Sequence, residues 1–218
     1  MISRLPPWVE YGAFALALVA GCVNAIAVLG LDHQALSHLS GTATSFGAGL
    51  GRLPWSQSLH LLLILMSFFC GALLSGFLAG GGALKLGHQY EILLVIEALL
   101  LFAATACFAQ GSPLGQYLAS AACGLQNALA TTYSGAVVRT THVTGLFTDL
   151  GIMLGSWCRG EAFDRRKFVL FSLIILGFIS GGIAGAWLFP RLSFMALLLP
   201  AGTCLVLAIV YHQYRVRQ

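Results

Sequence analysis

Long apolar stretches recur along the whole chain and are separated by short polar segments. Six of these stretches have the roughly 20 mostly apolar residues that a helix needs to cross a bilayer. They occupy residues 11–30, 59–80, 91–110, 113–136, 167–188 and 193–212. The pattern predicts an all-α protein whose long helices form a polytopic membrane bundle.

Two shorter segments, residues 36–52 and 141–158, are rich in Gly, Ser and Thr and are too polar to face lipid. Small residues let helix backbones approach closely, so these segments suit the interior of a bundle. A helix of such length reaches about 25 Å, which fits either a short crossing helix or a re-entrant hairpin. Each segment is nearly long enough to cross the bilayer and has positive residues at its C-terminal end, and both features favour a crossing helix. The two alternatives give a range of six to eight crossings.

The two polar segments resemble each other. At an offset of 104, His38 aligns with His142, Ser40 with Thr144, Gly41 with Gly145, and Ser45 with Asp149. A G-x-x-N-A motif also recurs, at 21–25 and 124–128, and a small-x-x-x-small motif occurs at 71–75 and 181–185. We therefore predict a single membrane domain, 1–218, built from two homologous halves, 1–110 and 111–218. Each half contributes three long helices and one short polar helix.

Composition supports a membrane protein, because 58% of the residues are hydrophobic and only 8% are charged, whereas soluble domains carry about a quarter. The net charge of +4 comes from cations between apolar runs. We interpret them as signals for orientation in the bilayer and expect no nucleic-acid partner. Both crossing arrangements put both termini in the cytoplasm. The six cysteines have no C-x-x-C spacing, so we predict neither disulfides nor a metal site.

The polar residues of the short segments are candidates for function. His38, Gly41, Thr42 and Ser45 have the i, i+3, i+4, i+7 spacing of one helical face. A polar stripe at membrane depth is costly unless it is paired or faces water, so the stripes suggest a path for a solute or ion. The alternative is that His and hydroxyl groups only bridge helices, with about 1 kcal/mol per hydrogen bond.

Polar residues of the long helices extend this set. Asn24 and Asn127 follow a glycine by three residues, so each amide shares a face with a small residue and can bind a substrate or join two helices. Gln126 points elsewhere and can satisfy a backbone group. The predicted path is lined by Asn24, His38, Ser40, Gly41, Thr42, Ser45, Gln126, Asn127, Thr141, His142, Thr144, Gly145 and Asp149.

Two carboxyl groups are candidates for coupling to protons. Glu97 lies well inside a long apolar run, and a carboxyl group buried in a low dielectric tends to hold its proton. Asp149 lies near His142, whose ordinary titration range is close to neutral pH. The alternative for Glu97 is a neutral acid that is hydrogen-bonded to a neighbour. The equivalent of Glu97 in the second half falls at or near Pro200, so the repeat does not support the proton role.

The glycines of the small-x-x-x-small motifs are expected to form helix contacts, including a seam for a homodimer. They are Gly71, Gly76, Gly181, Gly182 and Gly185, and Ser75 is a further small residue of these motifs. The expected partners are thus the lipid bilayer, an unknown small solute and a second copy of the chain. The chain has no G-x-S-x-G, H-E-x-x-H or Walker-type motif, so we predict no enzyme activity and no cofactor.

With these motifs, the sequence resembles the YoaK family of small bacterial membrane proteins, a domain of unknown function. The family's second-half pattern is matched by GLQNA at 124–128 and TTHVTG at 140–145. The first half departs from it, with Asn24 where Asp is usual and LSGT at 39–42 in place of M-T-G-N. The resemblance implies a multi-pass protein of the bacterial inner membrane and brings no established substrate.

Internal repeats with polar sites at their interface are a recurring plan of transporters. The leading hypothesis is therefore a small-solute transporter or channel with a link to protons, and the N-termini of the short helices favour an anionic solute. One alternative is an accessory or assembly protein without catalytic activity, in which the polar stripes are structural. A membrane-embedded enzyme is the third hypothesis.

Overall fold

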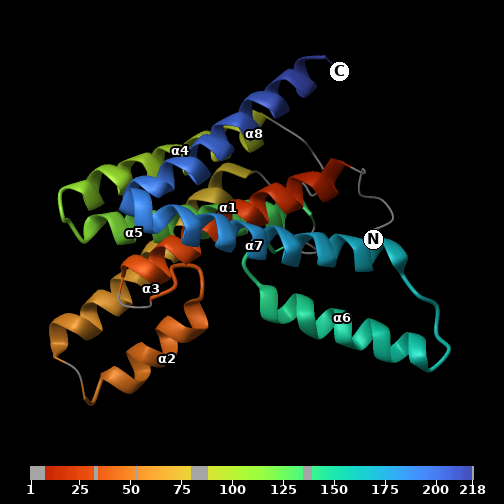
Figure 1. Cartoon of the computed structure of the whole chain (residues 1–218), viewed down its shortest axis with the longest axis horizontal. Coiled ribbons are helices and arrows are strands. Elements are labelled where there is room, and N and C mark those ends of the chain that lie inside the picture. Colours follow the sequence, from red (N-terminus) through yellow and green to blue (C-terminus); the bar gives the residue numbers. More distant parts are fainter. Residues whose placement is uncertain (1–7, 32–33, 53, 80–87, 135–138, 218) are drawn as a thin grey trace.

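In the computed structural model, the described residues are 8–31, 34–52, 54–79, 88–134 and 139–217, and their regular structure is helical (Figure 1). The elements are α1 (Trp8–Gly30), α2 (Leu39–Gly49), α3 (Trp55–Ala79), α4 (His88–Ala109), α5 (Leu114–Tyr133), α6 (Val143–Cys158), α7 (Arg165–Leu192), the 3-10 helix η2 (Ser193–Leu197) and α8 (Leu198–Val216). Five of the six predicted long stretches each fall on one long helix, and the sixth, 193–212, covers η2 and most of α8. The predicted ends at residues 80 and 135–136 lie outside the described residues.

Four helical stretches are long and apolar enough to cross a membrane. They are Glu10–Gly30, Trp55–Ala79, His88–Ala109 and Arg165–Val216, the last of which contains α7, η2 and α8. The chain is therefore a multi-pass membrane protein by its helix composition. Helix α5 is not among the four because it carries many polar residues. More than half of its residues are buried, and it packs against α3 and α4 inside the bundle.

Two helices end at glycines that adopt the left-handed conformation. Gly111 (φ 69°) follows α4 and Gly160 (φ 90°) follows α6. After each of them the next backbone N–H, that of Ser112 or Glu161, donates to a carbonyl five residues earlier. This is the Schellman arrangement, which satisfies the last carbonyls of a helix and needs a residue without a Cβ atom at the turn. The first of these turns lies at the predicted boundary between the two halves.

Glycines allow two helix pairs to approach very closely. In the pair α1–α7, a Cβ atom at Gly21 or Gly181 would overlap a backbone carbonyl of the partner helix. In the pair α3–α5, the same holds for Gly71 and Gly124. Without a strong hydrophobic force between helices in lipid, such close van der Waals packing is a main source of helix association.

These contacts change the expected role of the small-residue motifs. Gly71, Gly181 and Gly185 are buried and face backbone atoms of the same chain, so they are not free to form a homodimer seam. Only Gly76 and Gly182 of the predicted set have open space where a Cβ atom would lie. The sequence pattern identified residues that pack between helices, but it could not tell contacts within the chain from contacts between copies.

Ion pairs join helices at one end of the bundle. Glu10 of α1 and Arg166 of α7 are 3.2 Å apart. Glu91 of α4 accepts from Arg215 Nε at 2.5 Å and lies 2.9 Å from His212 Nδ1, both on α8. The start of α1 and the end of α8 therefore lie at the same end of the bundle, on the right in Figure 1.

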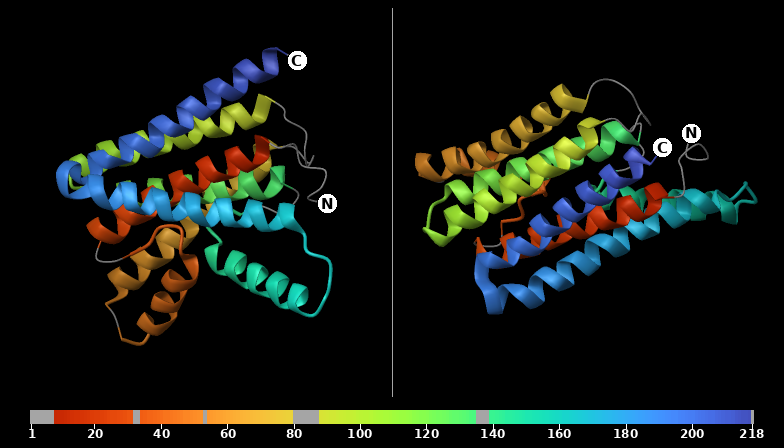
Figure 2. Two further views of the ribbon diagram at one scale, coloured as in Figure 1. Left: turned by 45° about the vertical axis from the view of Figure 1, so that its right-hand side comes forward. Right: turned by 90° about the horizontal axis from the view of Figure 1, so that it is seen from above.

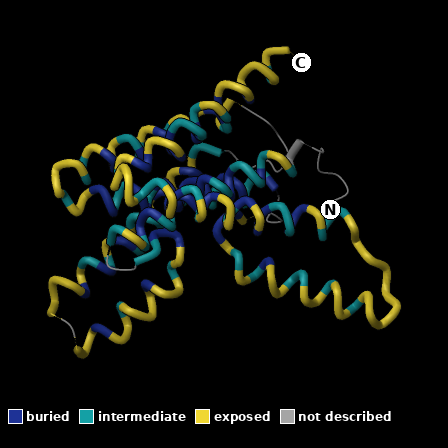
Figure 3. The backbone as a smooth tube through the Cα atoms, viewed as in Figure 1, coloured by how far each residue is buried: buried dark blue, intermediate teal, exposed yellow. Residues whose placement is uncertain are grey.

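The short helices α2 and α6 diverge from the main bundle (Figures 1 and 2). Most of their residues are exposed (Figure 3). Helix α2 has 11 residues and α6 has 16, which correspond to about 16 and 24 Å. Both are shorter than the roughly 30 Å of a bilayer's apolar core. Their lengths therefore do not support the expectation that both segments cross completely.

Candidate functional site

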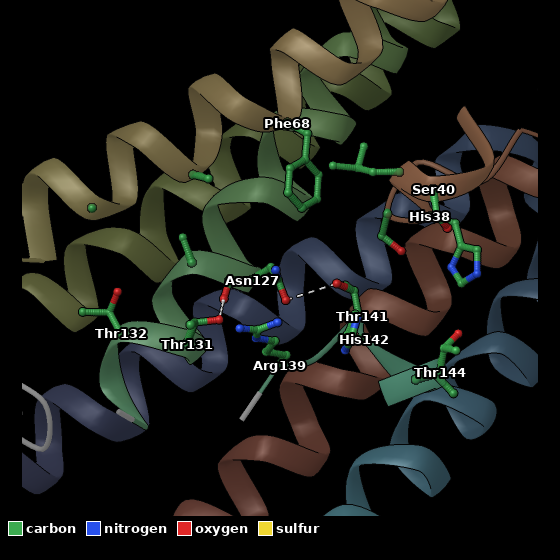
Figure 4. Close-up of a pocket in the computed structure, with 16 residues that line it drawn as sticks. His38, Ser40, Phe68, Asn127, Thr131, Thr132, Arg139, Thr141, His142 and Thr144 are labelled. Carbon is green, nitrogen blue, oxygen red and sulfur yellow. Dashed lines mark hydrogen bonds between the residues drawn. The ribbon is translucent and has the colours of Figure 1, made fainter. Parts of the chain in front are cut away.

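A cavity of about 850 Å³ lies where α2 and α6 begin. Its wall on one side is the segment Ser37–Ser40 at the start of α2, and on the other side residues 141–144 at the start of α6. Helix α3 contributes Phe68 and small residues, and α5 contributes Asn127 and the turn that follows it. Figure 4 shows these side chains around the cavity. Two segments that are about a hundred residues apart in sequence therefore share one site.

Two asparagines hold the segments that lead into α2 and α6. The Oδ1 atom of Asn24 accepts from the backbone N–H of Ser37 at 3.2 Å and from its hydroxyl at 3.1 Å. The Oδ1 atom of Asn127 accepts from the hydroxyl of Thr141 at 3.1 Å. Each amide thus fixes the residue directly before a histidine, so the two G-x-x-N-A motifs position the two starts.

The histidines occupy matching backbone positions. His38 is the N-cap of α2 with φ −96° and ψ 64°, and His142 is the N-cap of α6 with φ −92° and ψ 54°. Neither side chain caps its helix by a hydrogen bond. The ring of His142 lies over Gly145, where a Cβ atom would overlap it. The glycine is therefore required for this position of the ring.

The electrostatics of the cavity are positive. Helix N-termini carry free N–H groups and partial positive charge, and two of them meet at the cavity. Arg139 adds a full positive charge, and its side chain extends toward Asn127 and Thr131 in Figure 4. Among the described residues that line the cavity, none is a carboxylate. The arrangement disfavours a cation and suits an anion or a neutral solute with hydrogen-bond acceptors.

The structure brings together only part of the predicted path. Of the predicted residues, the cavity is lined by His38, Ser40, Asn127, Thr141, His142 and Thr144. Asn24 supports the wall through Ser37. Gln126 is buried and donates to the carbonyl of Leu16 at 2.8 Å, as expected for a residue that satisfies a backbone group.

The remaining predicted residues of α2 and α6 lie away from the cavity. Thr42 is buried, Gly41 and Ser45 are exposed, and Gly145 and Asp149 are half-buried; none lines the cavity. A shared helical face predicts a stripe along the whole helix, but α2 and α6 diverge, so only their first residues face each other. Of the two predicted polar stripes, only the residues at the starts of α2 and α6 line the cavity.

Glu97 also lies apart from the cavity. It is buried on α4, where the thiol of Cys204 donates to it. Its Oε2 atom has no hydrogen-bond partner among the described residues. The carboxyl group thus has a neighbour at one oxygen and none among the described residues at the other.

Sequence reasoning missed several lining residues. Arg139 was interpreted only as an orientation signal, although it precedes His142 by three residues. Thr131 and Thr132 lie about one turn after Asn127 on α5, and the hydroxyl of Thr131 donates to the Asn127 carbonyl at 2.6 Å. The helical spacing from Asn127 is a signal that identifies Thr131.

The described residues contain no group of three or more His, Cys, Asp or Glu side chains placed to hold a metal ion. Comparison with curated proteins and with solved structures finds no match for this chain. A family profile described as "Protein of unknown function (DUF1275)" matches residues 12–210. This match spans most of the chain, from the first turns of α1 to the middle of α8. The protein therefore belongs to the DUF1275 family, which corresponds to the YoaK-like membrane proteins.

Proposed function

We propose that this protein is a membrane transporter or channel for a small polar solute, with the cavity between the starts of α2 and α6 as its binding site. The observation that carries the proposal is that the first residues of two short helices line one cavity, together with an arginine and hydroxyl and amide side chains, in a membrane protein. Irregular backbone inside a membrane is tolerated where it lines a cavity, and broken helices with their N-termini at the substrate are a known transporter device.

We further propose that the chain consists of two related halves with opposite orientations in the membrane. Paired contacts support this: Gly21 of α1 meets α7 as Gly124 of α5 meets α3, and Gly181 of α7 meets α1 as Gly71 of α3 meets α5. In this proposal α2 and α6 re-enter the membrane from opposite sides, and each half has three crossings. Both termini then lie on one side, and the cations near that end favour the cytoplasm of a bacterial inner membrane.

The solute is proposed to be small and not cationic. A cation would meet Arg139 and two positive helix ends without a compensating carboxylate in the described lining. Hydroxyl groups from Ser40, Thr131, Thr141 and Thr144 supply further hydrogen-bonding groups. Anionic solutes and neutral solutes with acceptor oxygens both fit this chemistry, because helix N-termini and Arg offer donors.

Thermal stability of the detergent-purified protein against a panel of small anions, neutral polar solutes and cations tests the proposal. A solute that binds only the folded state raises the melting temperature, by an amount that grows with the logarithm of one plus the ratio of the solute concentration to Kd. We expect an anion or a neutral solute to give this shift, and Arg139→Gln or Thr144→Val to weaken its binding by about tenfold, the typical effect of one lost hydrogen bond to a ligand.

Thr148→Val is the matched control, because Thr148 lies one turn beyond Thr144 on α6 and does not line the cavity. Its hydroxyl donates to a backbone carbonyl of its own helix, as most exposed threonines of helices do. Equal loss of binding in Thr144→Val and Thr148→Val would contradict the assignment of the cavity. A cation that gives the largest shift would contradict the proposed solute class.

A link to protons is proposed through Glu97, supported by its burial and its free Oε2 atom. Since α4 packs against α5, a change at Glu97 can reach the cavity through α5. We expect Glu97→Gln to leave solute binding unchanged but to remove any acceleration of uptake by a pH gradient in proteoliposomes. Acceleration that persists in the variant would show that this carboxyl group does not couple to protons.

One observation favours a second candidate function, that of an accessory or assembly protein. Asn24, Asn127 and Gln126 all use their amides in hydrogen bonds within the chain, which is the expected use of structural groups. If Arg139→Gln and Thr144→Val lower stability alike and no solute shifts the wild type, this second function is favoured.

A further inference from the structure

A second cavity, of about 490 Å³, lies at the other end of the α3–α5 pair. Its polar lining comes from the segment after α1, the first two turns of α3 and the first turn of α5: Gln34, Ser56, Gln57, His60 and Gln116. Leu31 and Leu61 form its apolar wall. Sequence reasoning did not find this cluster, because its members are spread over more than eighty positions and none belongs to a repeated motif.

A directional chain of hydrogen bonds organises this cavity. Gln116 Nε2 donates to Gln34 Oε1 at 2.9 Å, and Gln116 Oε1 accepts from His60 Nε2 at 3.0 Å. The other ring nitrogen, His60 Nδ1, is hydrogen-bonded to the hydroxyl of Tyr117 at 2.6 Å. This pattern places a proton on Nε2 of His60. Gln116 is buried, so this series of hydrogen bonds is anchored in the protein interior.

The chain of bonds ends on a free donor. The amide NH₂ group of Gln34 has no acceptor among the described residues, although its Oε1 atom is used by Gln116. Of the described residues that line the cavity, none carries a carboxylate. Like the first cavity, this one offers donors and no carboxylate to balance the charge of a cation.

The two cavities lie in line along the same three elements. Helices α3 and α5 run in the same direction, since His60 bonds to Gln116 and the carbonyl of Ile64 accepts from Ser120. On α3, Leu61 lines the second cavity and Phe68 the first, a separation of seven residues or roughly 10 Å. In the segment before α2, Gln34 lines the second cavity and His38 the first.

Buried side chains close the interval between the cavities. Leu36 lies between Gln34 and His38, and Ile64 lies between Leu61 and Phe68; they are 2% and 1% exposed. Both belong to one apolar cluster with residues of α5. The two cavities are therefore separated by buried apolar side chains over about two helical turns.

We propose that the second cavity is a solute-binding site at the opposite mouth of the path through the first cavity, and that Leu36 and Ile64 form the closed barrier between them. The inference rests on the proposed function. Its ligand is a small solute with hydrogen-bond acceptors and without positive charge. Both linings offer hydrogen-bond donors, and neither contains a carboxylate among the described residues.

Cysteine labelling from each side of the membrane tests the placement of the two mouths. The full chain is used with Cys70, Cys107 and Cys158, the three cysteines that are not buried, replaced by alanine. In sealed vesicles of either orientation, we expect a membrane-impermeant maleimide to modify Ser56→Cys from one side and Thr144→Cys from the other. Adding Ile64→Ala is expected to let Thr144→Cys react from the Ser56 side as well.

Protection by small probes tests the ligand class. Acetate, acetamide and ethylammonium have similar sizes and differ in charge. We expect acetate or acetamide to slow modification of Ser56→Cys by about tenfold at about ten times its Kd. Gln110→Cys is the control, because Gln110 is exposed at the end of α4 near the start of α5 and does not line the cavity. Its modification is expected to be unchanged.

The outcomes separate this inference from the proposed transport. Modification of Ser56→Cys and Thr144→Cys from the same side overturns the two-mouth arrangement, whether or not the protein transports a solute. Protection by ethylammonium, or by none of the three probes, overturns the ligand class. Modification from opposite sides with probe protection, but without any flux in proteoliposomes, supports the second site while the proposed transport fails.

Discussion

Replacing Gly181 by alanine is expected to destabilise the protein strongly. The new Cβ atom would overlap the backbone carbonyl of Leu18 and approach the backbone N of Cys22 on α1. Backbone atoms cannot move aside as a flexible side chain can, so the helices must separate. Overpacking typically costs about 1–3 kcal/mol, and we expect the upper end of that range. The readout is the melting temperature in detergent, with an expected decrease of about 6–12 °C.

Gly182→Ala is the matched control. It adds the same methyl group at the next position of α7, where a Cβ atom has no neighbour within 4 Å. Alanine favours a helix over glycine by about 1 kcal/mol, so this variant is expected to be as stable as the wild type or slightly more stable. Similar melting temperatures for Gly181→Ala and Gly182→Ala would contradict the close contact of α1 and α7.

The pair α3–α5 gives an internal repetition of this test. Gly124→Ala would place a Cβ atom against the carbonyl of Phe68, in the same relation as Gly21 to Phe178. We expect a decrease similar to that of Gly181→Ala. Since α3 and α5 also line both cavities, Gly124→Ala is expected to reduce solute binding as well, whereas Gly21→Ala acts on stability alone.

Loss of the charge on Glu91 is expected to weaken the contact between α4 and α8. This carboxylate is 8% exposed and contacts Arg215, His212 and His88, so it joins the start of α4 to the end of α8. Removing one partner of a buried ion pair costs about 3–5 kcal/mol when the other charge stays buried. Arg215 is 35% exposed and keeps part of its hydration, so we expect about 2 kcal/mol for Glu91→Gln. Chemical or thermal unfolding in detergent measures it.

Glu161→Gln provides the comparison for an exposed pair. Glu161 and Arg159 are 55% and 66% exposed, and such surface pairs contribute about 0–1 kcal/mol. We expect almost no change in stability from this variant, and little dependence on salt for the Glu91 effect. If both variants behave alike, the cluster around Glu91 does not hold α4 and α8 together.

Much of the fold follows from local patterns along the chain. The six long helices are determined by apolar runs of sufficient length, since in lipid every backbone polar group must be satisfied within a helix. Gly111 and Gly160 end helices because the left-handed turn excludes most other residues. The family is identified by short motifs around Asn127 and His142. The positions of the asparagines left open whether each amide binds a substrate or joins two helices, and the structure shows bonds to Ser37 and Thr141.

Only the tertiary structure decided which polar residues share a site. Helical spacing relates residues on one helix and carries no information about the angle between two helices. It therefore grouped Ser45 and Asp149 with the histidines, although neither lines the cavity. Arg139 joins the cavity, and His60 joins Gln116 and Gln34, through contacts between distant segments. The sequence by itself determined which helices form and where they stop, because those depend on neighbours in the chain. The two cavities depend on how the helices cross, and that was decided by the close contacts at Gly21, Gly71, Gly124 and Gly181.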